Sequence, residues 1–199
     1  MRKLFNVAVN NTKEPVYSKT KNEDGSYSTW YCPAYKCWHH MIERCYSERS
    51  RSKYPTYADC TVCDDWLMFG SFRNWYYENA KEGYQLDKDL LSGNSKVYSP
   101  ETCTFIHQSV NKFLIDCSVH KSDHLNGASL RKDNGRFRSR CCNPITGRRE
   151  HLGNFKLEVD AHLAWANRKK EVAIMLANSD FVDDNRVRNA LMSMEFRQV

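Results

Sequence analysis

Two hairpin-turn signals, with an alternating stretch between them, most constrain the fold of this 199-residue chain. Residues 133–135, Asp-Asn-Gly, and residues 143–147, Asn-Pro-Ile-Thr-Gly, are rich in the residue types that tight turns require. Within residues 136–140 arginine alternates with Phe and Ser, which places Arg138 and Arg140 on the same face of a strand. The segment therefore predicts antiparallel strands with one basic face.

The same alternation extends to the strands on either side. It places Ser129 and Arg131 of the preceding strand, and Arg149 and His151 of the following strand, on the basic face. A helix should cover the opposite face, because apolar residues then recur at helical spacing. These residues are Val159, Leu163 and Ala166, with Ala161, Ala164 and Trp165 alongside.

Positive charge is concentrated in this part of the chain. Residues 125–172 hold eleven Lys and Arg against five Asp and Glu, a net charge of +6, which equals that of the whole chain. A compact module with such an excess is typical of a surface that contacts nucleic-acid phosphates. The alternative is an exposed strand face whose arginines are simply solvated.

A second pattern lies upstream, between residues 84 and 117. Residues 84–86 and 97–106 are rich in aromatic and β-branched types, and residues 92–95, Ser-Gly-Asn-Ser, form a turn cluster between them. This combination predicts a hairpin. The apolar residues that follow have helical spacing: Val110, Phe113, Leu114 and Cys117.

Two oxygen-bearing side chains fall at informative places in this pattern. Asp87 lies at the end of the first expected strand and Asn111 lies near the start of the helix. Mg²⁺ prefers oxygen ligands and is usually held by one or two protein groups plus substrate phosphate. The sequence thus predicts a sparse metal site, whereas the alternative is a solvated turn carboxylate and an ordinary helix residue.

The segment resembles the HNH, or His-Me finger, endonucleases. The resemblance rests on Leu-Asp-Lys-Asp-Leu-Leu at residues 86–91, on Tyr-Ser-Pro-Glu-Thr-Cys-Thr-Phe-Ile at residues 98–106, and on Asn111. It implies a ββα-metal fold, with Asp87 and Asn111 as ligands of Mg²⁺ or Mn²⁺. It further implies hydrolysis of phosphodiester bonds in double-stranded DNA.

One position departs from that family, because Lys88 stands where the family has its catalytic histidine. The acids on either side, Asp87 and Asp89, should keep this lysine charged, so it is a poor base. We expect Lys88 to hold the scissile phosphate or to stabilise developing negative charge. His107, one helical turn before Asn111, is the nearest candidate in sequence for a general base.

The basic segment resembles a second family, the AP2 DNA-binding domains. The matching stretches are residues 125–140, Leu-Asn-Gly-Ala-Ser-Leu-Arg-Lys-Asp-Asn-Gly-Arg-Phe-Arg-Ser-Arg, and residues 147–155. The resemblance implies a three-stranded antiparallel sheet that packs on one helix and enters the major groove. The expected DNA-reading face comprises Ser129, Arg131, Arg138, Arg140, Arg149 and His151. HNH and AP2 units occur together in homing endonucleases of phages and mobile introns.

These expectations give an α+β chain with several parts. Residues 1–29 form an N-terminal segment, residues 30–118 an HNH-like domain, and residues 124–178 an AP2-like domain, followed by a tail at residues 179–199. Within the HNH-like domain, helical support at 30–82 precedes the ββα core at 83–118.

The helical support is read from aromatic spacing and from turn residues. Pro33 can open a helix that carries Trp38, and Asp64 or Asp65 can cap a second helix with Trp66, Phe69, Phe72 and Trp75. The basic run at residues 47–57 is either a solvated loop or a phosphate contact. Packing against the hairpin is the expected role of this part.

The nine cysteines, an odd number, argue against a secreted disulfide framework. Cys60 and Cys63 form a C-x-x-C, and with Cys32, Cys37 and Cys45 upstream they are enough for a structural zinc site. Reduced structural cysteines are the preferred interpretation, because no second C-x-x-C completes a stronger pattern.

No apolar run of about 18 residues and no apolar signal segment occurs, so we expect a protein that is neither membrane-spanning nor secreted. The family resemblance implies the cytoplasm of a bacterial host and a phage gene. The expected partner is double-stranded DNA, bound by a monomer or a homodimer, and a single site predicts a nick. Two alternatives remain open: a catalytically degenerate phage DNA-binding protein, and a zinc-stabilised transcriptional regulator.

Overall fold

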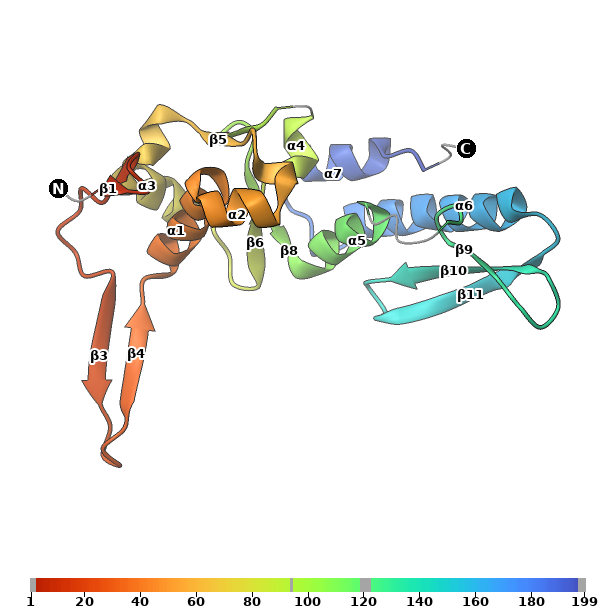
Figure 1. The fold of residues 1–199 in the computed structure, drawn as a ribbon, viewed down its shortest axis with the longest axis horizontal. Helices are drawn as coiled ribbons and strands as arrows, with labels where there is room; N and C mark the ends of the chain where they lie inside the picture. The colour runs from red at the N-terminus through yellow and green to blue at the C-terminus, as the bar shows by residue number, and fades with distance from the viewer. Residues whose placement is uncertain (1–2, 94, 119–122, 197–199) are drawn as a thin grey trace. The chain divides into compact units, whose positions relative to one another are not determined.

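The computed structural model describes residues 3–93, 95–118 and 123–196 (Figure 1). It confirms a mixed α+β chain whose sheets are small and mostly antiparallel. The chain divides into two compact units. The first comprises residues 1–82 and 86–105, and the second comprises residues 83–85 and 106–199. The helix predicted to close the core at 83–118 therefore belongs to the second unit.

The core of the first unit is helical and aromatic. Helix α1 (Pro33–Tyr46) begins at Pro33 as predicted, because the first turn of a helix needs no N–H from proline. It buries Trp38, whose Nε1 donates to the Trp66 carbonyl oxygen at 2.6 Å. The short helix α2 (Glu48–Lys53) and the 3-10 turn η1 (Pro55–Tyr57) follow.

Helix α3 (Phe69–Asn79) starts later than predicted. Asp64 and Asp65 lie in the separate 3-10 turn η2 (Asp64–Leu67), and Met68 occupies the N-cap of α3, so neither acid caps it. Aromatic packing sets this geometry, because the Trp66 ring lies 4.6 Å from Trp75 and 5.0 Å from Phe72 between ring centroids.

The short strands outside these helices form two-stranded pairs. β1 (Lys3–Leu4) pairs with β2 (Ala8–Val9), and β3 (Tyr17–Lys21) pairs with β4 (Tyr27–Tyr31), both antiparallel. β5 (Thr61–Val62) pairs in parallel with β7 (Val97–Tyr98). β6 (Tyr84–Asp87) pairs with β8 (Thr104–His107), and the short helix α4 (Asp89–Ser92) follows β6. The division between the units runs through β6 and β8.

The predicted hairpin differs from this arrangement, because residues 97–106 are not one strand. β7 joins β5, and only residues 104–107 pair with β6. The chain turns between the two strands: Thr102 Oγ1 accepts from the Ser99 amide at 3.0 Å and donates to the Val97 carbonyl oxygen at 2.7 Å. Asn94, in the predicted turn cluster, lies outside the described residues.

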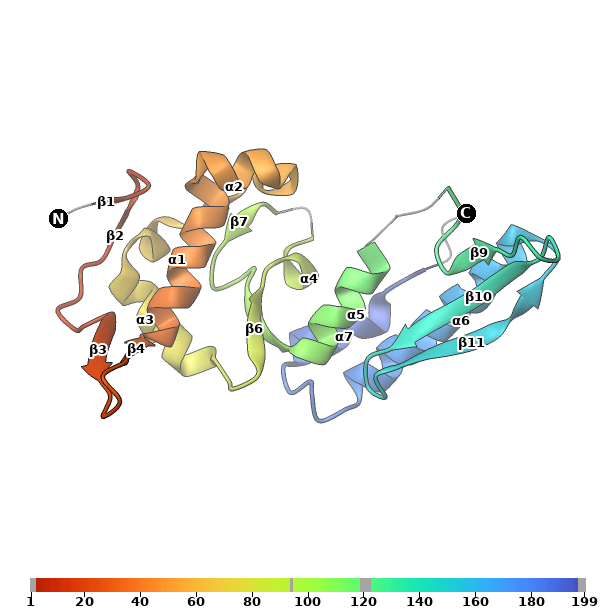
Figure 2. The same cartoon turned by 60° about the horizontal axis from the view of Figure 1, so that its bottom comes forward.

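The second unit holds a three-stranded antiparallel sheet in the order β11-β10-β9 (Figure 2). Its strands are β9 (Ala128–Leu130), β10 (Phe137–Asn143) and β11 (Arg148–Phe155), and helix α6 (Glu158–Ala177) covers one face. Ser139, Cys141 and Asn143 of β10 are buried on the α6 side, so the strand alternates as predicted. Helices α5 (Gln108–Ser118) and α7 (Asn185–Ser193) complete the unit.

Gly127, directly before β9, lies against Trp165 of α6. A Cβ atom there would lie 2.0 Å from a ring carbon of Trp165, and the backbone has a φ of +79°. Only glycine satisfies both conditions, which gives a packing reason for the glycine in the Leu-Asn-Gly stretch at residues 125–127. Among the described residues, no helix is both long and apolar enough to cross a membrane.

Candidate functional site

Asp87 is the last residue of β6 and lies in the first unit. Its Oδ1 accepts a hydrogen bond from the Leu90 amide at 2.9 Å. Burial raises the pKa of this carboxyl, and the Leu90 amide opposes the rise. The carboxylate is therefore short of solvation, and a nearby cation would stabilise its charged form.

Lys88 is buried, with 4% of its surface exposed. Its Nζ donates to Asp89 Oδ1 at 2.6 Å and lies 5.5 Å from the centroid of the Tyr98 ring. Burial by itself would lower the pKa of Lys88, but the hydrogen bond and charge of Asp89 outweigh it, so the pKa is raised. Lys88 is thus a permanent cation rather than a base.

Asn111 lies on α5 in the second unit. Its Nδ2 donates to Gln85 Oε1. The carbonyl oxygen is consequently the atom left for a metal ligand, as a hard divalent cation requires.

His107 ends β8, and its ring is held on both sides. It stacks on Phe181, with ring centroids 4.3 Å apart and planes inclined by 4°, and it meets the Tyr84 ring edge-on at 5.4 Å. The Tyr84 hydroxyl donates to the Phe181 carbonyl oxygen at 3.2 Å, which ties the same three residues together. Phe181 lies 74 positions beyond His107, and no local pattern in the sequence indicates this contact.

The hydrogen bond at His107 also selects its tautomer. Nδ1 accepts from the Ser109 amide at 3.2 Å, so a neutral ring carries its proton on Nε2. Nε2 is then a donor. This geometry suits a hydrogen bond to a phosphate oxygen better than removal of a proton from water.

The four predicted catalytic residues divide between the units. Asp87 and Lys88 belong to the first, and His107 and Asn111 belong to the second. Within each unit, the contacts described above fix the charge of Lys88 and the orientation of His107.

The basic face of the sheet can be read from the strand register. Ser129 and Asn154 pair with Arg138 from the two sides, and His151 pairs with Arg140. Arg149 pairs with Cys142. All lie opposite α6, because directly paired residues share a face.

A β-bulge on this sheet adds a residue that alternation did not predict. The register between β10 and β11 shifts between Ser139 and Arg140, so that Gly153 pairs with Ser139 on the α6 side. Asn154 thereby joins the basic face beside Arg138. A bulge re-aims side chains in this way, and Gly153, with a φ of +139°, is its signal in the sequence.

The cations of this face are not neutralised by the sheet itself. Burial, followed by the charges of Arg149 and Arg138, lowers the pKa of Arg140, although a guanidinium stays charged at neutral pH. The Nε atoms of Arg138 and Arg140 are buried without a hydrogen-bond partner among the described residues. The clustered guanidinium charges of Arg138, Arg140 and Arg149 favour an anionic ligand.

The nearest acids are engaged elsewhere. Glu150, on the α6 side, accepts from Arg168 Nε at 2.6 Å, and the bonds from Arg168 and Asn143 lower the pKa of Glu150 to about 2. Arg131 differs from its predicted neighbours, because it pairs with Asp133 through bonds of 3.0 and 2.5 Å and lies just beyond the end of β9. Its charge is therefore largely satisfied within the turn.

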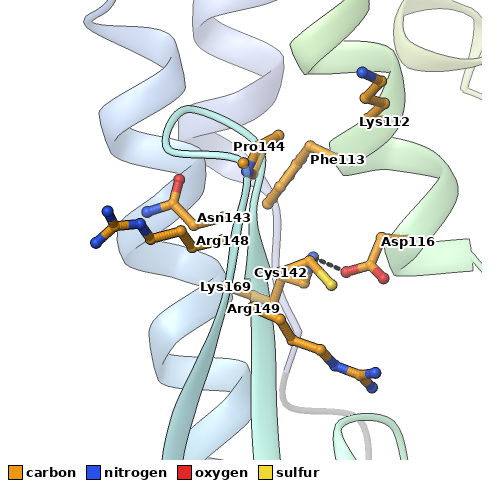
Figure 3. A pocket seen from close by; sticks show the side chains of 10 residues that line it. Lys112, Phe113, Asp116, Cys142, Asn143, Pro144, Arg148, Arg149 and Lys169 are labelled. Atoms are coloured by element: carbon orange, nitrogen blue, oxygen red, sulfur yellow. Dashed lines mark hydrogen bonds and ion pairs between the residues drawn. The ribbon is translucent and has the colours of Figure 1, made fainter.

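A cavity of about 270 Å³ adjoins the basic face, between α5 and the β10–β11 turn (Figure 3). Arg149 lines both the face and the cavity, and Lys112 and Arg148 add two further cations. At its floor the fully buried Lys169 forms an ion pair with Asp116 and lies 4.7 Å from the centroid of the Phe113 ring. The cavity thus extends the positive surface toward the helix that carries Asn111.

The basic run at 47–57 forms α2 and η1. Arg51 Nε donates to the Ala58 carbonyl oxygen at 3.0 Å, while Arg49 and Lys53 line an open cavity of about 470 Å³ with Arg44. These cations face solvent, which fits either of the roles expected for the run.

Burial determines the protonation state of several cysteine thiols. It raises the pKa values of Cys37, Cys45 and Cys103 to about 12, so these thiols stay protonated at neutral pH. A metal-binding cysteine must be a thiolate. Across residues 3–93, 95–118 and 123–196, no three His, Cys, Asp or Glu side chains gather in a way that could hold a metal ion.

Compared with models of protein families, with curated proteins and with solved structures, the chain matches none. The chemistry of the residues described above is therefore the basis for assigning a function.

Proposed function

We propose that this protein is a metal-dependent endonuclease that cleaves double-stranded DNA, with an HNH-like catalytic part and an AP2-like DNA-binding sheet. The observation that carries the proposal is the basic face of the three-stranded sheet, where Arg138, Arg140 and Arg149 have no ion-pair partner among the described residues. A polyanion with regularly spaced acceptors is the ligand that best satisfies such a face.

The order of elements supports the catalytic half of the proposal. β6 pairs with β8, and β8 leads directly into α5, so a strand pair and a following helix are present as in a ββα-metal unit, although α4 and β7 lie between the two strands. The AP2-like half is supported in the same way by β9, β10 and β11 with α6 on one face.

The resemblance to the HNH endonucleases assigns the ligand roles for Mg²⁺ or Mn²⁺ to Asp87 and to the carbonyl oxygen of Asn111. The donor set fits a hard cation, and the pKa of Asp87, raised by burial, indicates a carboxylate that a cation would stabilise. When bound, such an ion neutralises the charge that builds on the phosphate and on the leaving 3′ oxygen.

The other two candidate site residues, Lys88 and His107, act on the phosphate and its negative charge. Lys88 contributes a fixed positive charge, and its burial together with its ion pair to Asp89 favours electrostatic stabilisation over direct contact with phosphate. His107 donates from Nε2 to a phosphate oxygen, as its tautomer allows. The attacking water then loses its proton to solvent. One such site per chain gives a nick, and a double-strand break requires a homodimer or two events.

Incubation of the purified protein with DNA of its source genome, with Mg²⁺ or with EDTA, tests the proposal. We expect nicking that depends on Mg²⁺. Asp87→Ala and Asn111→Ala should abolish nicking while preserving DNA binding, because neither residue belongs to the arginine face of the sheet.

A second candidate function follows from Lys88. A lysine in place of the family's histidine suits a catalytically degenerate DNA-binding protein. Specific binding without cleavage in Mg²⁺ or Mn²⁺ would favour this candidate and remove the nuclease assignment.

A further inference from the structure

The hairpin of β3 and β4 is exposed along its entire length. All ten strand residues are exposed, and the pair forms a sheet of only two strands (Figure 1). A two-stranded ribbon is marginally stable in water by itself, and its outer edges are open to further binding. Its aromatic content is high for such a position, because Tyr17, Tyr27 and Tyr31 are 57%, 65% and 58% exposed.

The register separates the two faces of this hairpin. Tyr17 pairs with Tyr31, Lys19 with Thr29, and Lys21 with Tyr27. These six residues share one face, which we call the Lys-Tyr face. The opposite face carries Ser18, Thr20, Ser28 and Trp30. The hairpin is therefore two-sided, with every cation and every tyrosine of its strands on one side.

The Lys-Tyr face offers donors and no carboxylate. The acids of the hairpin, Glu23 and Asp24, lie in the turn at its tip, and Asp24 accepts bonds from the amide and hydroxyl of Ser26. Within the described part of the chain, neither Lys19 nor Lys21 has an ion-pair partner. Lysine ammonium and tyrosine hydroxyl groups are both common donors to phosphate oxygens.

We propose that the Lys-Tyr face is a second DNA-binding surface, which contacts the phosphate backbone of duplex DNA independently of the arginine sheet. The inference rests on the proposed function for the identity of the polymer. A two-stranded ribbon also has a suitable width, because the major groove of B-DNA, about 12 Å wide, admits one.

A second copy of the chain fits this face less well. In a twofold interface the same patch meets itself. Lys19 and Lys21 would then be desolvated against the lysines of the other copy, with no carboxylate on the face to offset the repulsion. Duplex DNA supplies the opposite charge.

The test compares full-length variants binding to a labelled DNA duplex of mixed sequence, in EDTA, over a range of salt concentrations. Lys19→Ala with Lys21→Ala should reduce the slope of log affinity against log salt by about two units, at roughly 0.9 per phosphate contact. The charge-matched control is Lys36→Ala with Lys96→Ala, two exposed lysines elsewhere in the first unit. It should leave the slope near that of the wild type.

Two further variants separate the faces. Tyr17→Phe with Tyr27→Phe and Tyr31→Phe removes three hydroxyls without removing rings, and should weaken binding several-fold. Trp30→Ser, on the opposite face, should leave affinity unchanged. Circular dichroism and melting curves confirm that each variant folds.

Equal slopes for the two double-lysine variants would overturn the inference, because a general charge effect would then explain both. The inference would also be overturned if the Lys19 and Lys21 variant sedimented differently but kept its DNA affinity, because the face would then serve self-association. A loss of binding to single-stranded DNA alone would overturn it as well. Binding is measured without metal, so a failure of cleavage leaves this result intact and refutes only the nuclease assignment.

Discussion

The rings of His107 and Phe181 are parallel to within 4° at a centroid distance of 4.3 Å, and the Ser109 amide donates to His107 Nδ1. The C-terminal segment after α6 thereby supports a candidate catalytic side chain. This contact gives Phe181 a positioning role for the His107 ring, which the sequence did not indicate.

Replacing Phe181 with alanine should release the His107 ring. Aromatic pairs contribute about 0.5–1.5 kcal/mol beyond the area they bury, so we expect a modest loss of stability and a larger loss of nicking rate, with unchanged DNA affinity. ¹⁵N chemical shifts of the imidazole should show a mixture of tautomers in place of the Nε2–H form. Phe181→Tyr, which keeps the stack, should restore both readouts; a variant that loses stability alone would show that Phe181 is only structural.

Asp87 should make the metal-free protein less stable as pH rises. Its folded pKa lies above the ordinary value of about 3.9, so the stability present below that value is lost as pH increases through the folded pKa. Asp87→Asn should therefore melt at a higher temperature than the wild type at neutral pH, and the difference should vanish in acid. Mg²⁺ should raise the melting temperature of the wild type only. An equal response of both proteins to Mg²⁺ would place the ion elsewhere.

Arg140→Ala tests the basic face of the sheet. If Arg140 reads a base edge, discrimination among sites should fall by about 1–3 kcal/mol; if it contacts phosphate, binding to all sequences should weaken and the salt slope should drop by about one unit. Arg131→Ala is the matched control, because Asp133 already neutralises that side chain. Unchanged binding in the variant that lacks Arg131, Arg138, Arg140 and Arg149 would exclude the sheet as a DNA-binding surface.

Substitutions of Lys88 test the effect of having a lysine where the HNH endonucleases have a histidine. Lys88→Ala should lower the nicking rate sharply, since it removes a buried positive charge that Asp89 holds in place. Lys88→His should leave activity intact or raise it. Cleavage by Lys88→His and not by the wild type would identify the natural protein as a DNA-binding relic of a nuclease.

The cysteines should bind no stoichiometric zinc, because burial keeps thiols such as Cys45 protonated. Elemental analysis of protein purified without added metal should detect no zinc, and a chelator should leave the melting temperature unchanged. The opposite result would be one equivalent of zinc that disappears, together with stability, in Cys60→Ser with Cys63→Ser.

Local pattern by itself determined the elements whose signals are contained in a few neighbouring residues. Pro33 and the spacing of Trp38 predicted the start and the buried stripe of α1, and the alternation through Arg138 and Arg140 predicted the two faces of β10. The physical reason is that helix capping, helical periodicity and strand alternation depend only on residues a few positions apart in the sequence.

The tertiary structure decided what depends on distant partners. β6 pairs with β8 rather than with residues 97–98, the bulge brings Asn154 beside Arg138, and Phe181 orients His107. Strand partners and ring stacks join residues far apart in the chain, and their stability comes from packing that no local pattern encodes. The α+β class and the basic face of the sheet could therefore be predicted from the sequence, whereas the orientation of the candidate catalytic residues is determined only by the tertiary structure.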